Sequence, residues 1–221
     1  GAPLLNSLQA RAEVVANGFG NQPVIDNFGD PVAASDSLTN GGVTSTAAAE
    51  ATYGILKASA EISKGAAIEP FNFATGTAQF IDTLTISGGV GGDDVSFDFQ
   101  LDGMLQDINA GEQRARVTLD VFLPDTIQSF NETFFVESGN SRSLNELVQT
   151  GDFAFDYDVP FTVEVTLTAY VELEESDNGT ASSEFFNTSV LTGVNVTSGG
   201  VPVSGTTLSS SSGTSYPIPE P

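Results

Sequence analysis

The sequence predicts an all-β protein: an antiparallel β-sandwich of jelly-roll-like type, with an extended N-terminal strand segment and an extended C-terminal tail. Three observations predict this fold. Apolar and polar residues alternate with a period of two in several segments. Gly, Asn and Asp separate these segments at short spacings, and helical periodicity is almost absent. Strands of this kind bury one face and expose the other, which accounts for an apolar content of 39% without a membrane role.

Residues 1–42 are predicted to form an N-terminal strand segment followed by a loop. Leu8, Ala10, Ala12 and Val14 alternate with mostly polar residues, which is the spacing of a strand. The same segment also carries a helical stripe of apolar residues, and we favour the strand because the remaining chain is β-rich. Residues 18–42 are rich in Gly, Asn, Asp and Pro and predict a loop. Because so long a loop is uncommon inside a compact domain, we expect the first segment to be separable from the body.

Residues 43–203 are predicted to form the sandwich itself. Residues 46–62 predict either two strands around Gly54 or one long bent strand. The clearest alternation runs over 95–101, and Asp102 with Gly103 predicts a turn directly after it. Residues 144–148 predict a single helical turn. The other predicted strands are 71–87, 114–123, 133–136, 153–157, 161–173 and 185–196.

Residues 204–221 are predicted to form the C-terminal tail. A Ser/Thr/Gly run leads to Tyr216, and Pro219, Glu220 and Pro221 follow shortly after it. Proline fixes the backbone angle φ and removes a backbone donor, so this tail is expected to be extended. Such a segment is typical of a tether or a recognition peptide that lies outside the core.

The Pro-Glu-Pro motif after a Ser/Gly-rich spacer resembles the PEP-CTERM sorting signal of exported bacterial proteins. Segments 51–60, 80–89 and 186–203 are similar in style to members of that family. In the family, a membrane-spanning helix and a basic cluster follow the motif, and an exosortase processes the signal at the cell envelope. This sequence has neither after the motif, so it resembles a processed or truncated form. The resemblance implies a bacterial extracellular or cell-surface location and an exosortase-type processing partner.

The charge and residue usage exclude several classes of function. Six basic residues against 29 acidic ones give a net charge of −23, which opposes binding to nucleic acid or to anionic membrane surfaces. The chain has no Cys and no His, so thiol chemistry, a disulfide framework and a Ser-His-Asp triad are impossible. No apolar run approaches the roughly 20 residues of a membrane-spanning helix. A carboxylate pair of the glycosidase type stays possible among the 29 acidic residues, but the chain has no Trp, on which sugar-binding clefts usually stack their ligands. With these groups missing, we predict that the protein is not an enzyme.

Calcium is the one cofactor that the acidic residues suggest. Calcium takes six to eight oxygen ligands from carboxylates and carbonyls, often in loops. Asp93 and Asp94 are adjacent acids that follow a glycine-rich loop, and they are the first candidates for metal ligands. Asp152, Asp156 and Asp158 form a second acidic group along one strand. The alternative is that these carboxylates lie on solvated faces and keep the protein soluble.

Self-assembly is the function that the sequence favours. The Leu8, Ala10, Ala12 and Val14 face could add as a strand to the sheet of the next subunit. A head-to-tail contact of this type does not close on itself, so it generates a filament. The alternative is that this segment folds back as an edge strand of its own domain. The prediction is a secreted structural protein of the extracellular matrix or cell surface whose main partner is itself. The alternative is a monomeric, surface-displayed module that binds glycans or mediates adhesion, with extracellular polysaccharide as its partner.

Overall fold

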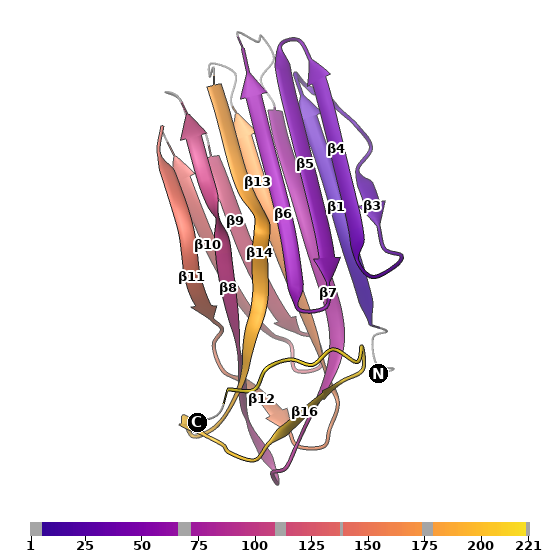
Figure 1. The fold of residues 1–221 in the computed structure, drawn as a ribbon, viewed down its shortest axis with the longest axis vertical. Helices are drawn as coiled ribbons and strands as arrows, with labels where there is room; N and C mark the ends of the chain where they lie inside the picture. Colours follow the sequence, from indigo (N-terminus) through magenta and orange to yellow (C-terminus); the bar gives the residue numbers. More distant parts are fainter. Residues whose placement is uncertain (1–5, 66–71, 109–113, 138, 174–178, 220–221) are drawn as a thin grey trace.

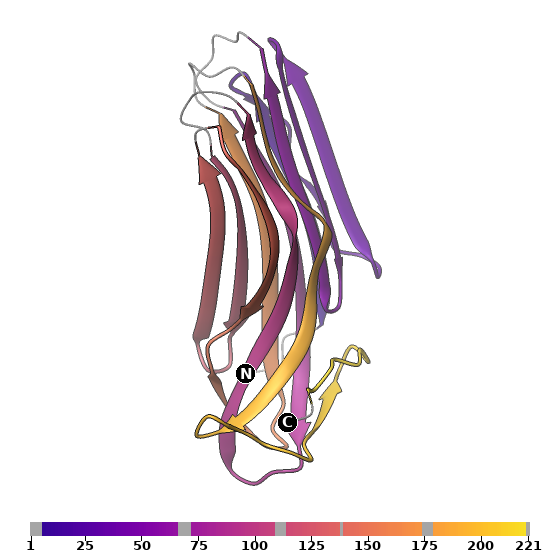
Figure 2. The ribbon, with the colours of Figure 1, turned by 60° about the vertical axis from the view of Figure 1, so that its left-hand side comes forward.

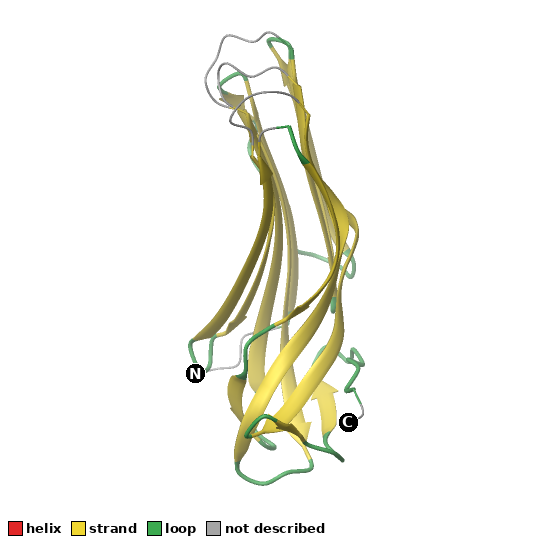
Figure 3. Cartoon of the chain, turned by 90° about the vertical axis from the view of Figure 1, so that its left-hand side faces the viewer, coloured by secondary structure: helices red, strands yellow, loops and turns green. Residues whose placement is uncertain are grey.

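A computed structural model describes residues 6–65, 72–108, 114–137, 139–173 and 179–219. Within these ranges the chain forms strands and no helix. Two antiparallel sheets face each other along the length of the molecule (Figure 1), and Figure 3 views the two layers from the side. The predicted all-β antiparallel sandwich is confirmed.

Sheet A contains the N-terminal strand near one of its edges. Its central strand β7 (Asn72–Ser87) pairs with β13 (Phe161–Leu173) on one side and with β1 (Ser7–Ala16) on the other. The remaining strands of sheet A are β10 (Gln128–Glu137), β9 (Arg114–Leu123), β2 (Phe19–Gly20), β3 (Val24–Asp26) and β16 (Thr207–Ser210).

Sheet B is built around the long strand β14 (Gly179–Ser198). It lies between β8 (Gly92–Ile108) and β6 (Ile55–Lys64), and β5 (Val43–Thr52) follows β6. The other strands of sheet B are β4 (Val32–Asn40), β11 (Ser141–Gln149), β12 (Phe153–Asp156) and β15 (Val201–Pro202). Gly54, with φ of +81°, makes the turn between β5 and β6, so the prediction of two strands around this glycine is confirmed.

Three local predictions were wrong, each for a physical reason. Part of the predicted loop 18–42 is strand β4, whose small and polar residues gave little strand signal. Residues 144–148 belong to β11 and not to a helical turn, because Leu144 and Val148 share one face in a strand as well as in a helix. Strand β8 continues through Gly103 without turning, because Gly103 pairs with Leu144 of β11, and a Cβ atom at this position would lie 2.5 Å from the Phe185 ring.

The interior of the sandwich has two differently packed regions. We call one region the alanine side, because the inward residues of β1, β4, β5, β6 and the first half of β7 are mostly alanine. The backbones of the two sheets nearly touch there. A Cβ atom on Gly76 would lie 2.3 Å from the carbonyl oxygen of Ala48 in the opposite sheet. At the phenylalanine end, large rings fill the space between the sheets: Phe80, Phe97, Phe99, Phe153, Phe155 and Phe161. Small side chains therefore allow the close approach of the two sheets on the alanine side.

Candidate functional site

The N-terminal strand β1 lies in the sheet of its own chain. It pairs with β7 over nine residues, from Ser7 opposite Ile81 to Val15 opposite Phe73. Its inward face contains the residues predicted for strand addition, and all of them are buried: Leu8, Ala10, Ala12 and Val14. The strand prediction for this segment is therefore confirmed over the helical alternative.

Strand β1 packs against β4, β5 and β7 on the alanine side, and we call the surface of these three strands that contacts β1 the groove. Across the sandwich, the buried Ser45 hydroxyl of β5 donates a hydrogen bond of 2.8 Å to the carbonyl oxygen of Val15. On its other edge, β1 pairs with the short strands β2 and β3 at residues 15–16 and 10–12. The expected boundary at residue 43 is not present, because β4 and β5 pair in one hairpin that packs against β1. The N-terminal segment is thus part of the core of its own chain.

One short connection joins this segment to the rest of the chain. We call residues 7–26 the arm. Residues 27–31 lead from β3 in sheet A to β4 in sheet B, and we call them the hinge. The carboxylate of Asp26 accepts hydrogen bonds from the backbone N–H groups of Phe28 and Ala33, at 3.1 and 3.2 Å. Phe28 in the hinge is 86% exposed. The arm therefore depends on β7 and on the alanine side, with few contacts at the hinge itself.

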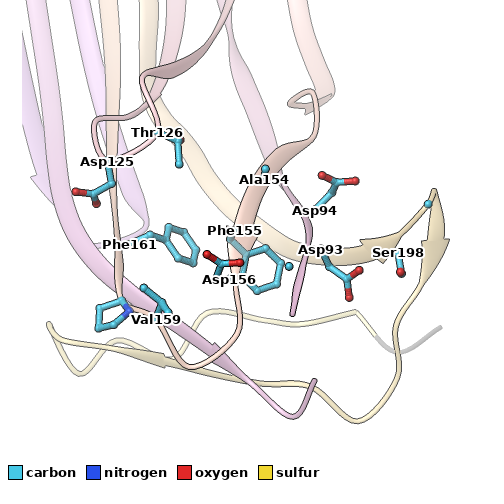
Figure 4. Close-up of a pocket in the computed structure, with 13 residues that line it drawn as sticks. Asp93, Asp94, Asp125, Thr126, Ala154, Phe155, Asp156, Val159, Phe161 and Ser198 are labelled. Atoms are coloured by element: carbon cyan, nitrogen blue, oxygen red, sulfur yellow. The ribbon is translucent and has the colours of Figure 1, made fainter. Parts of the chain in front are cut away.

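A second site is an acidic cavity of about 560 Å³ at the phenylalanine end (Figure 4). Strand β12 pairs with the start of β8, so Asp93 lies opposite Phe155 and Asp94 opposite Ala154. The turn after β9 and the end of β14 complete the wall. The polar lining residues are Asp93, Asp94, Asp125, Thr126, Asp156 and Ser198.

Hydrogen bonds already occupy two of the acids around this cavity. The pKa of the Asp93 carboxyl is lowered by its hydrogen bonds with Ser198 and with Tyr157, whose hydroxyl donates at 2.7 Å. Burial, together with the Asp93 carboxylate, raises the pKa of Tyr157 to about 12. The Asp125 carboxylate accepts a hydrogen bond of 2.7 Å from the backbone N–H of Thr162. These acids therefore hold the end of the sandwich together.

The cavity does not gather the acids as a metal site would. In the part of the chain that the structure describes, no group of three or more acidic side chains is placed to hold a metal. Asp152 and Asp158 are not among the lining residues, whereas Asp156 is. Calcium at Asp93 and Asp94 therefore stays a prediction. What the lining does offer is carboxylate and hydroxyl oxygens next to the Phe155 and Phe161 rings, a combination that can hydrogen-bond a polyhydroxyl ligand.

The C-terminal tail is bound to the sandwich, contrary to the expectation of a tether outside the core. Strand β16 pairs with the end of β7, and Figure 2 shows the segment crossing the lower end of the molecule. Tyr216 is buried, and its ring stacks on Phe80 at 6.5 Å. Pro219 lies against Gly193 of β14, while Glu220 and Pro221 of the predicted sorting motif are outside the described residues.

Sequence reasoning missed the residue that anchors this tail. Asp82 is completely buried, and the Tyr216 hydroxyl donates to its carboxylate at 2.7 Å. A signal was available, because Asp82 lies between Phe80 and Leu84 at an inward position of an alternating strand. A buried carboxylate requires hydrogen-bond donors, and hydroxyl-rich segments are the natural place to look for them.

No protein-family model and no curated protein matches this chain. Among the described residues, no helix is long and apolar enough to cross a membrane.

Proposed function

We propose that this protein is a structural component of a bacterial extracellular matrix or cell surface, and that it forms filaments by exchanging its arm between subunits. In the single chain the arm fills its own groove. In the filament, the same arm would leave that groove and fill the groove of the next subunit, with β1 pairing to β7 in the same register. The observation that carries the proposal is that one five-residue hinge connects the arm to the body.

Exchange of the arm would conserve every contact within the groove. The inward residues of β1 would still meet β4, β5 and β7, so only the hinge and the surfaces around it would change. A head-to-tail exchange leaves one empty groove and one free arm at the two ends of each oligomer. It therefore propagates into a filament, since nothing in the contact requires closure.

Removing the arm from the groove would lose less apolar burial than removing other strands. The buried face of the arm consists of Leu8, Val14 and three alanines. Full burial of a leucine or valine contributes about 1.5–3 kcal/mol, whereas each alanine methyl contributes about 0.8 kcal/mol. A strand carrying several buried phenylalanines would be held far more tightly.

A disulfide that locks the arm in place tests this proposal. Gln9 and Gln79 lie directly opposite each other on β1 and β7, on the outer face of the sheet. The natural chain has no cysteine, so an introduced pair can form only the intended disulfide. A Gln9→Cys/Gln79→Cys variant oxidised as a monomer should form no filaments in negative-stain electron microscopy, and reduction should restore them. A Thr118→Cys/Thr133→Cys pair, which links β9 to β10, is the matched control and should assemble in both states. Filaments formed by protein whose arms are all linked within their own chains would refute arm exchange.

The high negative charge gives cations a part in the proposed assembly. A net charge of −23 opposes the close packing of subunits, so bound calcium would favour a filament. Filaments prepared with calcium should dissociate or shorten on addition of a chelator, and Asp93→Asn/Asp94→Asn should reduce that sensitivity if these residues hold the ion.

The proposed location follows from the tail. Pro219, Glu220 and Pro221 would act as the PEP-CTERM-like element recognised by an exosortase-type enzyme. Replacing all three with Ala in the producing bacterium should leave the protein unprocessed and reduce its amount in the matrix fraction, measured by immunoblotting of cell fractions.

The acidic cavity favours a second candidate function, a monomeric module that binds extracellular polysaccharide. Carboxylate and hydroxyl oxygens beside two phenylalanine rings are suited to sugar hydroxyl groups and to the apolar face of a sugar ring. A glycan array probed with monodisperse protein separates the candidates. Clear hits that disappear in Asp94→Ala/Asp156→Ala, without filaments under any condition, would favour the adhesive module.

A further inference from the structure

The arm and the tail share one edge of β7. Strand β13 pairs with β7 from Asn72 to Leu84, and it occupies the opposite edge. Leu84 pairs with Phe161 of β13 and also with Ser210 of β16, so β16 must lie on the edge that β1 uses. Along this edge, β1 covers residues 73–81 of β7 and β16 covers residues 84–87. The two segments thus lie end to end, with Asp82 between them.

The tail is fixed at this junction by the Asp82 carboxylate. Oδ2 of Asp82 lies 2.6 Å from the Ser210 hydroxyl, 2.6 Å from the Ser212 hydroxyl and 2.7 Å from the Tyr216 hydroxyl. Oδ1 accepts hydrogen bonds from the backbone N–H groups of Thr83 and Ser212, at 2.8 and 3.1 Å. A buried carboxylate with so many donors fixes the position of the segment that supplies them, because each unpaired donor or acceptor there would be costly.

The tail bound at Asp82 also contacts the residue directly before the arm. The Ser211 hydroxyl donates a hydrogen bond of 2.8 Å to Oδ1 of Asn6, the residue that precedes β1. The backbone N–H of Ser211 donates to the carbonyl oxygen of Thr83 at 2.9 Å. That carbonyl belongs to the part of the β7 edge into which β1 would move if it slid towards the tail. The tail therefore occupies the backbone position that a shifted arm would need.

The arm needs such a stop because its own side chains specify register weakly. A shift of two residues keeps Leu8, Ala10, Ala12 and Val14 on the inner face, where small residues pack against small residues. Such a shift would place Leu8 opposite Asp82 in place of Phe80. The tail bound at this junction and the Asp82 carboxylate both oppose this shifted arrangement of the arm.

We infer that the tail, hydrogen-bonded to Asp82, fixes the register of the arm by blocking a shift of β1 towards the tail. We call the tail in this role the register stop, and Asp82 is the residue that positions the tail. The stop acts on the arm of the same chain, and it acts on the arm of a neighbouring copy if the proposed exchange takes place. Only the second part rests on the proposed function. In that case the partner group is Asn6, the residue that directly precedes the incoming arm, and it would meet Ser211 of the receiving subunit.

Introduced cysteine pairs measure the register directly. Gln9→Cys/Gln79→Cys reports the observed register, and Gln9→Cys/Ile81→Cys reports an arm shifted by two residues towards the tail. Each pair is placed in the full chain with Asp82 intact and with Asp82→Ala. Linked peptides are identified by mass spectrometry after mild oxidation of a mixture of ¹⁵N-labelled and unlabelled protein. In the Asp82→Ala background, the yield of the 9–81 link should rise roughly tenfold, the scale of losing a buried hydrogen bond.

The outcomes separate this inference from the proposed function. An unchanged yield of the 9–81 link in Asp82→Ala overturns the register stop, whatever the assembly state. Links that join only peptides of the same label overturn arm exchange and leave the stop within one chain intact. Asp102→Ala, which removes an exposed acid from β8, is the matched control and should leave both links unchanged.

A second variant covers the case in which Asp82→Ala does not fold. Tyr216→Phe removes the 2.7 Å hydrogen bond and keeps the ring stacked on Phe80, and Ser212→Ala removes another donor. The double variant should raise the 9–81 link in the same direction by a smaller factor. A folded double variant with the link pattern of the parent protein would contradict the proposed role of the tail.

Discussion

The alanine side and the phenylalanine end of this sandwich stabilise it in different ways. On the alanine side the two sheets approach until a Cβ atom on Gly76 would meet the Ala48 backbone, and each strand buries little apolar area. At the phenylalanine end, the rings of Phe97 and Phe153 lie 6.0 Å apart. There the Tyr157 hydroxyl donates a hydrogen bond to Asp93, and the Thr150 hydroxyl accepts one from the backbone N–H of Phe97. Close backbone packing gives a groove with a precise shape but a modest hold on any one strand. Large rings hold each strand more strongly but define the shape of the space around it less precisely.

This difference indicates which part of the molecule can change partners. If the arm leaves, the body keeps its large aromatic side chains, and the surface it uncovers is made mostly of alanine. The same departure from the phenylalanine end would expose several rings. We therefore expect local opening to begin on the alanine side.

The largest effect is expected at the phenylalanine end. Phe97→Ala empties a fully buried site next to Phe153 and should lower the free energy of unfolding by about 3–5 kcal/mol. Phe135→Ala removes a ring that is 58% exposed and should change it by less than about 0.5 kcal/mol. Urea denaturation followed by circular dichroism measures both, and similar values for the two variants would contradict the packing described.

Overpacking the alanine side should have the next largest effect. The added methyl group of Gly76→Ala would meet the backbone oxygens of Ala48 and Ser59 at 2.3 and 2.6 Å, so the sheets must move apart. We expect a loss of about 1–3 kcal/mol in the free energy of unfolding and faster hydrogen exchange in β1. Gly151→Ala, where an added methyl group would meet no atom within 4 Å, is the control. Unchanged exchange in β1 would show that the tight sheet spacing does not hold the arm.

A smaller effect is expected from the arm itself. Val14→Ala removes two buried methyl-sized groups and should lower the free energy of unfolding by roughly 1–2 kcal/mol. Because this loss falls on the arm, hydrogen exchange should quicken in β1 and in the facing part of β7 but not in β8. Equal acceleration in all three strands would mean that the arm opens only with the whole sandwich.

Sequence patterns predicted the strands whose alternation combines large apolar and polar residues. The face of β13 from Val163 to Leu173 and the segment around Phe97 were recognisable in this way. Strand β4 was missed because its inward residues, Val32 and Ala34, lie among small polar ones. A core that depends on close backbone approach needs no large apolar side chains, so the usual signal is weak there.

The candidate sites were predicted less well, because they depend on contacts between distant segments. The sequence shows Asp93 next to the acidic Asp94, yet the partners of Asp93 are Tyr157 and Ser198, far away in the sequence. The tail resembled a tether because serine, threonine and proline rarely build a core. Its place in the structure comes from Asp82, whose carboxylate uses those hydroxyl groups.

The smallest effect concerns the closure of the phenylalanine end at alkaline pH. Burial and the Asp93 carboxylate raise the pKa of Tyr157 to about 12. Because the folded pKa lies above the ordinary value near 10, the stabilisation is fully present below pH 10 and is lost as the pH rises towards 12. The tyrosinate absorbance of the parent protein minus that of Tyr157→Phe should therefore show one group titrating near pH 12. Asp93→Asn should move that midpoint towards 10, whereas Asp120→Asn, on the exposed β9–β10 pair, should not. A Tyr157 midpoint near 10 in the parent protein would mean that this end is open to water, and the contrast between the two regions would then rest on the rings alone.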